Sequence, residues 1–186
     1  MKQITREEAE ETLQQDYPTF VEIWRKGWDA WKQVVEQFPA LGSRTRANVI
    51  SDVAKGFIRD KFQSELRCSI YEKGGMFLLR YETLDARFKK LNGSFPSNIP
   101  TKQSELLANQ QLSLGEELEP KTVVNIGYVV DKTWSKMRFA VSCTKGKNIV
   151  WRIDLPLIEE PEIVVDIPET DVPQQPKRKR VYKKAL

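Results

Sequence analysis

The sequence predicts an α+β fold in which amphipathic helices come first and a mainly antiparallel sheet follows. Up to about residue 63, apolar residues recur every three or four positions, which is the period of a helix buried on one side. Beyond that point they alternate with polar residues in six short segments, which is the period of strands. Strands and helices do not alternate along the chain, so a parallel dinucleotide-binding sheet is not expected.

Three helices are expected in the first 63 residues. Thr5 and Glu8 form a capping-box pattern ahead of a short helix that runs to about residue 15. A second, longer helix covers residues 16–38, and Ser43 or Thr45 caps a third. Because aromatic and aliphatic side chains at helical spacing are usually buried, we interpret the apolar stripes of both long helices as core. The stripes comprise Phe20, Trp24, Trp28, Trp31, Val35 and Phe38 in the second helix, and Ile50, Val53, Ala54, Phe57, Ile58 and Phe62 in the third.

Six strands are expected after residue 63, in two groups of three that flank a short helix. Gly74 and Gly75 mark a turn in the first group, and Thr101 caps the helix, which ends near residue 109. Asp85, Arg87 and Lys89 are expected to face outward from the third strand. The residues predicted to face inward include Leu66, Cys68, Ile70, Leu84, Ala86, Phe88, Val124, Ile126, Tyr128, Val130, Met137, Phe139, Val141, Cys143, Ile149, Trp151, Ile153 and Leu155. The order is therefore β-β-β-α-β-β-β.

The chain length of 186 residues fits one domain followed by a tail. We expect the domain to span residues 1–155, helical over 1–63 and sheet-forming over 64–155. The sequence contains no histidine, which excludes histidine zinc sites and Ser-His-Asp triads. The two cysteines lie within strand patterns and are predicted to be buried thiols. No cofactor motif and no membrane-spanning apolar run occurs, so we expect no cofactor and a cytoplasmic location. The sequence does not indicate an oligomeric state.

The last thirty residues separate their charges into two blocks. Residues 156–176 hold six carboxylates, five prolines and no Lys or Arg, a composition typical of an extended linker. Residues 177–186 form a basic tail, whose binding candidates are Lys177, Arg178, Lys179, Arg180, Lys183 and Lys184. Such a tail can bind nucleic acid or an acidic partner, fold back on the acidic linker, or serve solubility alone.

Basic residues of the folded part provide further candidates for phosphate contact. Arg44, Arg46 and Asn48 lie at the expected start of the third helix, where free backbone N–H groups attract anions. On the polar face of the sheet, the candidates are Arg87, Lys89, Arg138 and Arg152, which would form a positive stripe if their strands were neighbours. The alternative for both sets is an ordinary helix cap and a solvated sheet face.

An enzymatic alternative needs no histidine. The alternative is a metal-dependent nuclease or toxin that acts on nucleic acid. Such a protein uses carboxylates on adjoining strands to hold Mg²⁺, with a lysine near the phosphate that is attacked. Glu82, Asp85 and Lys89 are the residues that best match this requirement. A mixed-charge strand face exposed to solvent is the other interpretation of the same residues.

Several segments together resemble a group of small bacterial proteins encoded in mobile or prophage-like regions. The segments are residues 43–50, 87–91, 97–101, 126–128 and 150–151. The resemblance covers roughly residues 28–155 and excludes the tail. Proteins of this group are encoded beside helix-turn-helix regulators and zinc-peptidase-like proteins. The resemblance therefore implies a regulatory or defence setting, and it assigns no reaction. We therefore expect a non-enzymatic binding protein whose partner is nucleic acid or a protein of the same operon.

Overall fold

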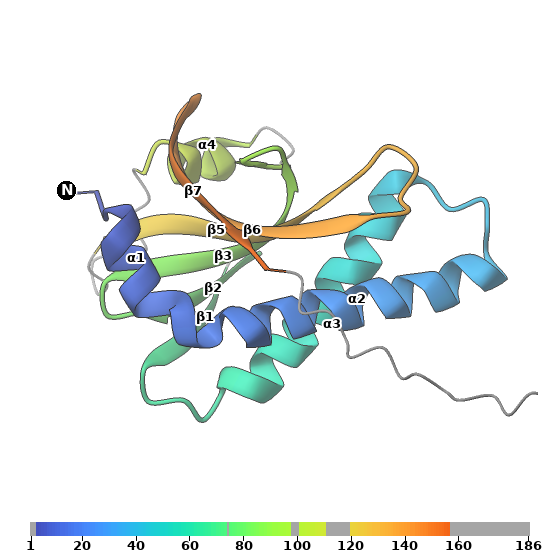
Figure 1. Cartoon of the computed structure of the whole chain (residues 1–186), viewed down its shortest axis with the longest axis horizontal. Coiled ribbons are helices and arrows are strands. Elements are labelled where there is room, and N and C mark those ends of the chain that lie inside the picture. Colours follow the sequence, from blue (N-terminus) through green and yellow to red (C-terminus); the bar gives the residue numbers. More distant parts are fainter. Residues whose placement is uncertain (1–2, 74, 98–100, 111–119, 157–186) are drawn as a thin grey trace, which may run out of the picture.

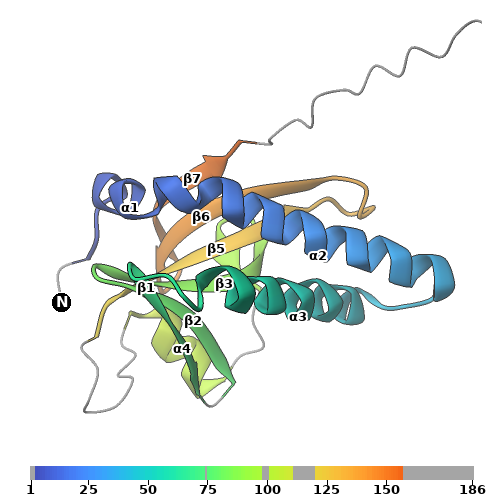
Figure 2. The same cartoon turned by 90° about the horizontal axis from the view of Figure 1, so that it is seen from below.

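The computed structural model describes residues 3–73, 75–97, 101–110 and 120–156. Within them, helices from the N-terminal part lie against one face of a twisted sheet, and a short later helix lies on the other side (Figures 1 and 2). The expected α+β class is confirmed. The linker from residue 157 onward and the whole basic tail lie outside the described residues, as does Gly74 of the predicted turn.

The helices begin and end close to their predicted limits. They are α1 (Arg6–Leu13), the 3₁₀ turn η1 (Gln14–Asp16), α2 (Tyr17–Gln37), α3 (Ser43–Phe62) and α4 (Lys102–Ala108). Thr5 caps α1 as predicted: its hydroxyl accepts the Glu8 N–H at 3.2 Å, and the Glu8 carboxylate accepts the Thr5 N–H at 2.8 Å. The predicted cap of α3 was wrong, because Gly42 is its N-cap and both Ser43 and Thr45 are helical.

The strands form one sheet with the order β1-β2-β3-β5-β6-β7, and a short β4 pairs with the end of β3. Their bounds are β1 (Cys68–Lys73), β2 (Met76–Tyr81), β3 (Leu84–Asn92), β4 (Phe95–Pro96), β5 (Thr122–Val130), β6 (Met137–Lys145) and β7 (Asn148–Leu155). Neighbouring strands are antiparallel except at the centre, where β3 and β5 run parallel from Leu84↔Thr122 to Lys90↔Tyr128. The connection through α4 returns the chain to the starting edge, which parallel pairing requires.

The hydrophobic core lies between the sheet and the N-terminal helices. Trp24 is fully buried there, with its ring 6.2 Å from that of Phe88 on β3 and 4.9 Å from that of Tyr128 on β5. Trp28 and Trp31 are buried as well, so the tryptophan stripe belongs to the core as predicted. Burial of each such side chain stabilises the fold by about 1.5–3 kcal/mol.

Three predicted core residues are exposed instead: Phe38, Leu66 and Ile149, the last of which is 50% exposed near the start of β7, where the register between β6 and β7 shifts. Phe38 is 59% exposed because α2 ends at Gln37, and the backbone at Phe38 turns away from the helical stripe. Leu66 is fully exposed because β1 begins only at Cys68, so the alternation of the strand does not extend back to it. The same prediction was correct for Cys68, which is buried.

A close approach of backbones fixes the centre of the sheet. A Cβ atom added to Gly127 on β5 would lie 2.1 Å from the carbonyl oxygen of Lys89 and 2.6 Å from Cγ of Leu91. Real Cβ atoms do not come this close to a backbone oxygen, so only glycine fits at this position. The backbone of β3 at Lys89 is therefore held tightly against β5.

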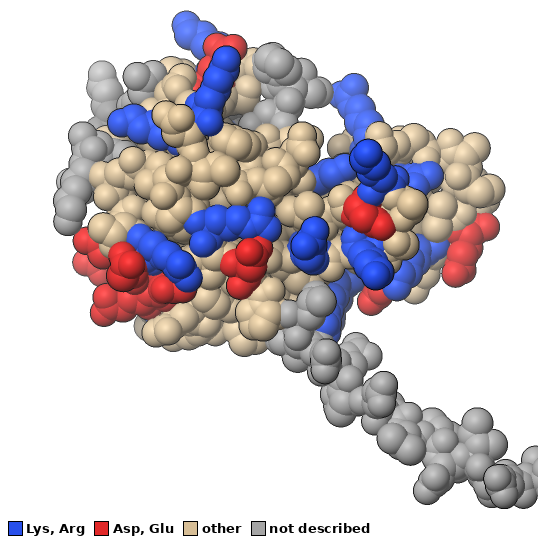
Figure 3. Space-filling view, turned by 45° about the horizontal axis from the view of Figure 1, so that its top comes forward, with Lys and Arg blue, Asp and Glu red and all other residues tan. Residues whose placement is uncertain are grey.

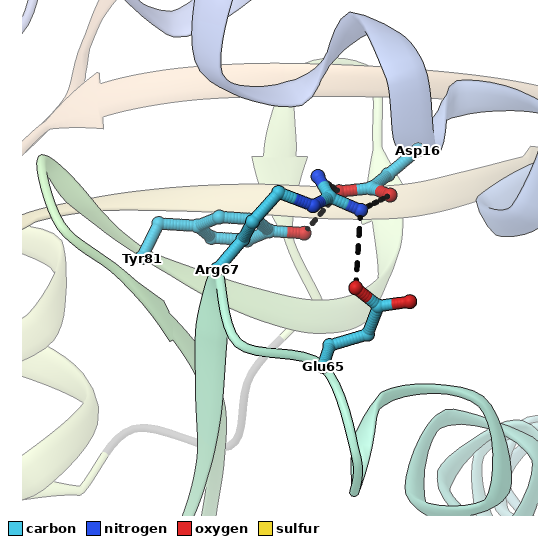
Figure 4. Close-up of polar contacts among 4 residues, drawn as sticks. All are labelled: Asp16, Glu65, Arg67 and Tyr81. Atoms are coloured by element: carbon cyan, nitrogen blue, oxygen red, sulfur yellow. Dashed lines mark hydrogen bonds and ion pairs between the residues drawn. The ribbon is translucent and has the colours of Figure 1, made fainter.

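A polar cluster around the buried Asp16 carboxylate joins the helices to the outer strands (Figure 4). Asp16, at the end of η1 and only 4% exposed, accepts hydrogen bonds from Arg67 Nη1 at 3.3 Å and Nη2 at 3.1 Å. It also accepts the Tyr81 hydroxyl at 2.8 Å, and burial together with the Asp16 charge raises the pKa of Tyr81. Glu65 pairs with the same guanidinium at 3.4 Å. The four residues are thus engaged in holding β1 and β2 against the start of α2.

The other face of the sheet is covered in part by α4. The side-chain amide of Gln110, just after α4, donates to the Val123 carbonyl at 2.8 Å and accepts the Val123 N–H at 2.7 Å. It also donates to the Thr144 carbonyl at 3.0 Å. These bonds fix the end of α4 across β5 and β6.

Candidate anion-binding pocket

A pocket opens where two neighbouring strands separate. The pairing of β2 with β3 ends at Leu78↔Arg87, although both strands continue past this point, and the β1–β2 hairpin runs away from β3 (Figure 2). The space between them, of about 550 Å³, is bounded by α3 from Ser43 to Lys55, by the far end of β3, and by Ser97 together with residues at the start of α4. Consecutive residues of β3 line it, so the pocket lies at the open edge of that strand.

The polar lining comes from three elements. Arg44, Asn48 and Lys55 of α3 are spaced by four and seven residues and therefore share one face of the helix. Arg87, Lys89 and Lys90 extend from β3, and hydroxyl groups of Ser43, Ser97, Thr101 and Ser104 complete the set. Arg44 and Asn48 of the predicted helix site thus lie with Arg87 and Lys89 of the predicted sheet site in one pocket. Sequence reasoning missed Lys55 and Lys90, although the helical spacing from Asn48 points to Lys55.

The electrostatics of the pocket are strongly one-sided. None of its described lining residues is an Asp or a Glu. Burial lowers the pKa of Lys89, and the charges of Arg87 and Lys55 lower it further. Burial also lowers the pKa of Arg87 to about 10 and shifts that of Lys90 downward. Like charges held together in a partly buried space destabilise one another, so a bound anion would relieve the repulsion.

Among the lining residues, Lys55 forms an ion pair with the carboxylate of Asp52. That carboxylate lies 3.5 Å from the ammonium group of Lys55, one turn earlier on α3, and the Asp52 side chain is largely exposed to solvent. Exposed pairs of this kind contribute only about 0.3–0.5 kcal/mol on a helix. Such a pair leaves the net positive charge of the pocket wall in place.

The wall beside α4 is built from groups that are fixed locally. The Thr101 hydroxyl accepts the Ser104 N–H at 3.1 Å, and the Ser104 hydroxyl accepts the Thr101 N–H at 2.9 Å, so Thr101 caps α4 as predicted. The Ser97 N–H donates to the Lys90 carbonyl at 2.8 Å, which holds the chain beyond β4 against β3. The hydroxyl side of the pocket is therefore attached to the same strand that carries its cations.

A tryptophan in the β5–β6 loop borders the pocket through Lys90. The Lys90 ammonium lies 4.5 Å from the ring centroid of Trp134, and that ring stacks on Trp28 at 6.1 Å with an interplanar angle of 5°. Trp134 has a positive φ of 58°, which non-glycine residues rarely adopt. Asp131 stabilises the loop by accepting the N–H groups of Ser135 and Lys136 at 2.8 and 3.1 Å, and hydrogen bonds lower its pKa.

The remaining basic candidates of the folded part lie elsewhere. The Arg46 guanidinium packs over the rings of Trp31 and Trp134, at 4.9 and 5.6 Å, and its Nε donates to the Leu41 carbonyl at 3.0 Å. Arg138 is exposed on β6, which β5 separates from β3. These two side chains therefore do not contribute to the pocket.

Arg152 on β7 is also separated from the pocket. It pairs with Asp154 and donates to the Gly93 carbonyl at 3.0 Å. The turn between β3 and β4 lies over the intervening strand, since the Ser142 hydroxyl of β6 donates to the Ser94 carbonyl at 2.7 Å. The four sheet cations predicted to form a stripe consequently fall into separate groups.

The residues proposed for a metal-dependent nuclease do not form a carboxylate cluster. Asp85 is only 1% exposed and accepts a hydrogen bond from Arg80 Nε at 2.8 Å, so the prediction that it faces solvent was wrong. Burial raises the pKa of Asp85, and Arg80 opposes that shift. Glu82 is exposed in the β2–β3 turn, while Lys89 lies about 13 Å farther along β3 from Asp85. In the described part of the chain, no group of three or more His, Cys, Asp or Glu residues is arranged to hold a metal ion.

Comparisons with known protein families, with curated proteins and with solved structures found no match. Among the described helices, none is both long enough and apolar enough to cross a membrane. On the face shown in Figure 3, Lys and Arg side chains extend across the middle, interrupted by carboxylates, and many of the Asp and Glu residues lie toward the edge.

Proposed function

We propose that this protein is a non-enzymatic binding protein that contacts the phosphates of nucleic acid through the pocket between α3 and β3. The observation that carries the proposal is the convergence of Arg44, Lys55, Arg87 and Lys89 on one space whose described lining contains no carboxylate. Cations that converge in this way are typical of phosphate-binding sites, because each Lys or Arg near a phosphate releases a counterion from the nucleic acid.

The chemistry of the lining favours nucleic acid over an acidic protein surface. Guanidinium groups match the geometry of phosphate oxygens, and a side-chain amide such as that of Asn48 can hydrogen-bond to a base edge. A partly buried pocket admits a protruding phosphate more easily than a carboxylate on a flat protein surface. The basic tail over residues 177–186 would add sequence-independent affinity.

The setting proposed for this activity follows from the resemblance to proteins of mobile and prophage-like regions. We place the protein in the cytoplasm, in a regulatory or defence system, with a protein of the same operon as the alternative partner. A partner protein would bind the same cations. A direct measurement of nucleic-acid binding therefore distinguishes the two possibilities.

Fluorescence anisotropy with labelled DNA and RNA at several salt concentrations tests the proposal. The logarithm of the association constant should fall linearly with the logarithm of the salt concentration, because phosphate contacts release counterions. Arg44→Gln should weaken binding, whereas Lys147→Met, which removes an exposed cation from the β6–β7 turn, should not. Truncation after Pro176 should reduce the slope by several units and leave the effect of Arg44→Gln in place. If neither nucleic acid binds at low salt, the proposal is wrong and a protein partner takes its place.

A further inference from the structure

The size and chemistry of the pocket point to a narrower ligand than nucleic acid in general. We propose that the pocket takes the terminal phosphate monoester of a nucleotide, with the attached nucleoside against its apolar wall. This inference rests on the proposed function and specifies which phosphate the site selects. The source of the monoester is either a free nucleotide or the phosphorylated end of a single strand.

The dimensions of the pocket exclude a duplex from its interior. A volume of about 550 Å³ lies within the range of sites that hold small ligands. A B-form duplex, whose major groove alone is about 12 Å wide, is much larger than such a ligand and contacts only the rim. Arg87 and Lys89 are partly buried, and a phosphate must enter the pocket to reach them. One nucleotide at a chain end or in solution meets this requirement.

The charge of the pocket suits a monoester better than an internal phosphate. A terminal phosphate monoester carries about 1.5 to 2 negative charges near pH 7 and presents three acceptor oxygens. A phosphodiester within a chain carries one negative charge. Lys55, Arg87 and Lys89 line the same pocket, and the charges of Arg87 and Lys55 lower the pKa of Lys89. The more highly charged ligand relieves more of their repulsion.

The remaining lining explains why the ligand is a nucleotide and not inorganic phosphate. Met76 contributes partly exposed apolar surface to the same pocket that holds the cations, and the buried side chains of Phe77 and Leu107 lie behind it. The ring of Phe77 is held in place by the Arg59 guanidinium, which lies 5.3 Å from its centroid. Inorganic phosphate would leave this surface exposed to water, whereas a nucleoside covers it. The Asn48 amide and nearby hydroxyl groups supply hydrogen-bonding partners for a base or a sugar.

A binding experiment with the full chain tests the monoester site separately from nucleic-acid binding in general. Three fluorescent single strands of one sequence would be compared: one with a 5′-phosphate, one with a 3′-phosphate and one with hydroxyl groups at both ends. At least one phosphorylated strand should bind about tenfold tighter than the hydroxyl strand, the difference expected for hydrogen bonds to a charged group. Because the tail is present in every titration, its sequence-independent contribution cancels in this comparison.

Two variants and one control locate the effect in the pocket. Lys89→Met removes the central ammonium group and retains the apolar stem, and it should abolish most of the preference for the phosphorylated strand. Arg44→Gln changes an exposed residue, so it should fold normally and reduce the same preference. Lys147→Met removes one positive charge outside the pocket and should leave the preference intact. A thermal unfolding curve for each protein establishes that it is folded.

The source of the monoester is identified by competition. If adenosine monophosphate displaces the phosphorylated strand and adenosine does not, the ligand is a free nucleotide. If neither compound displaces the strand, the phosphorylated strand end is required. Both results support a monoester site, provided that the phosphorylated strand is preferred. Equal affinity for all three strands would overturn the inference, and if Arg44→Gln weakened all three equally, the proposed nucleic-acid binding would still stand. Absence of binding to every probe would overturn both.

Discussion

Replacing Lys89 by Met should stabilise the ligand-free protein, even though it weakens binding. The substitution keeps the volume and the apolar stem of the side chain and removes only the ammonium group. In the folded state, burial and the charges of Arg87 and Lys55 disfavour that ammonium group and lower its pKa. A binding site that gathers like charges is therefore expected to reduce the stability of the free protein.

The magnitude follows from the surroundings of Lys89. Its side chain is partly exposed, so solvent screens each like-charge repulsion to some tenths of a kcal/mol, and desolvation adds a comparable amount. We expect Lys89→Met to raise the free energy of unfolding by about 1 kcal/mol at pH 7, equivalent to a rise in Tm of about 2–4 °C. The matched change Lys147→Met should alter stability by less than about 0.5 kcal/mol.

The pH dependence of this difference has a defined sign. Because the pKa of Lys89 is lower in the folded protein than its ordinary value of 10.5, the unfolded chain binds more protons in the pH interval between the two values. The penalty from Lys89 is fully present below that interval and disappears as the pH rises through it. The advantage of the Met variant should therefore shrink at alkaline pH.

Urea denaturation followed by circular dichroism measures the effect, at low salt and at pH 7 and 10. Loss of stability by 1 kcal/mol or more in Lys89→Met at pH 7 would refute the reasoning, because the ammonium group would then contribute a favourable interaction within the folded chain. A difference that is unchanged at pH 10 would show that it arises from packing and not from charge.

Three further predictions concern the fold. Gly127→Ala should lower the free energy of unfolding by about 3 kcal/mol in a urea titration, because the new Cβ meets a carbonyl oxygen of β3; a loss below 1 kcal/mol would contradict the close packing. Asp16→Ala should cost about 1.5–3 kcal/mol, because it leaves the buried Tyr81 hydroxyl without its acceptor. Tyr81→Phe should cost only about 1 kcal/mol, because Asp16 keeps its hydrogen bonds to Arg67. Changes in Tm close to zero for both variants would argue against the cluster. Burial raises the pKa of Cys68 from 9.0 to about 11 and the pKa of Tyr17 from 10.0 to about 12. Each protonated group therefore contributes stability that is complete below its ordinary pKa and is lost as the pH rises through the raised value. The free energy of unfolding, measured from pH 8 to 12, should decline accordingly.

Local patterns were sufficient to predict most of the secondary structure. The period of apolar residues in α2 and in the strands arises from burial of one face, and that requirement is already present in the order of the residues. Capping patterns at Thr5 and Thr101 were equally informative, because the bonds that they form join residues only three positions apart. The errors at Phe38 and Leu66 lie at element ends, where a pattern continues for one or two residues beyond the structure that produces it.

The parallel pairing of β3 with β5 could not be predicted in the same way. It depends on the path of the chain through α4, and the fit of Gly127 against the Lys89 carbonyl is visible only once the two strands are neighbours. Asp85 shows the same limit: alternation placed it opposite the core, but a partner on β2, Arg80, makes its burial acceptable. Contacts between distant residues decide such cases.

For the candidate site, the sequence by itself determined the chemical character. It provided Arg44, Asn48, Arg87 and Lys89 as cationic and amide groups, and the lack of histidine restricted the reactions open to the chain. Only the tertiary structure decided that these groups, from a helix and a strand some forty residues apart, line one pocket while Arg46, Arg138 and Arg152 do not. The reason is physical: the charge of a side chain is a property of the residue, whereas its neighbours are set by how helices and strands pack to bury their apolar faces.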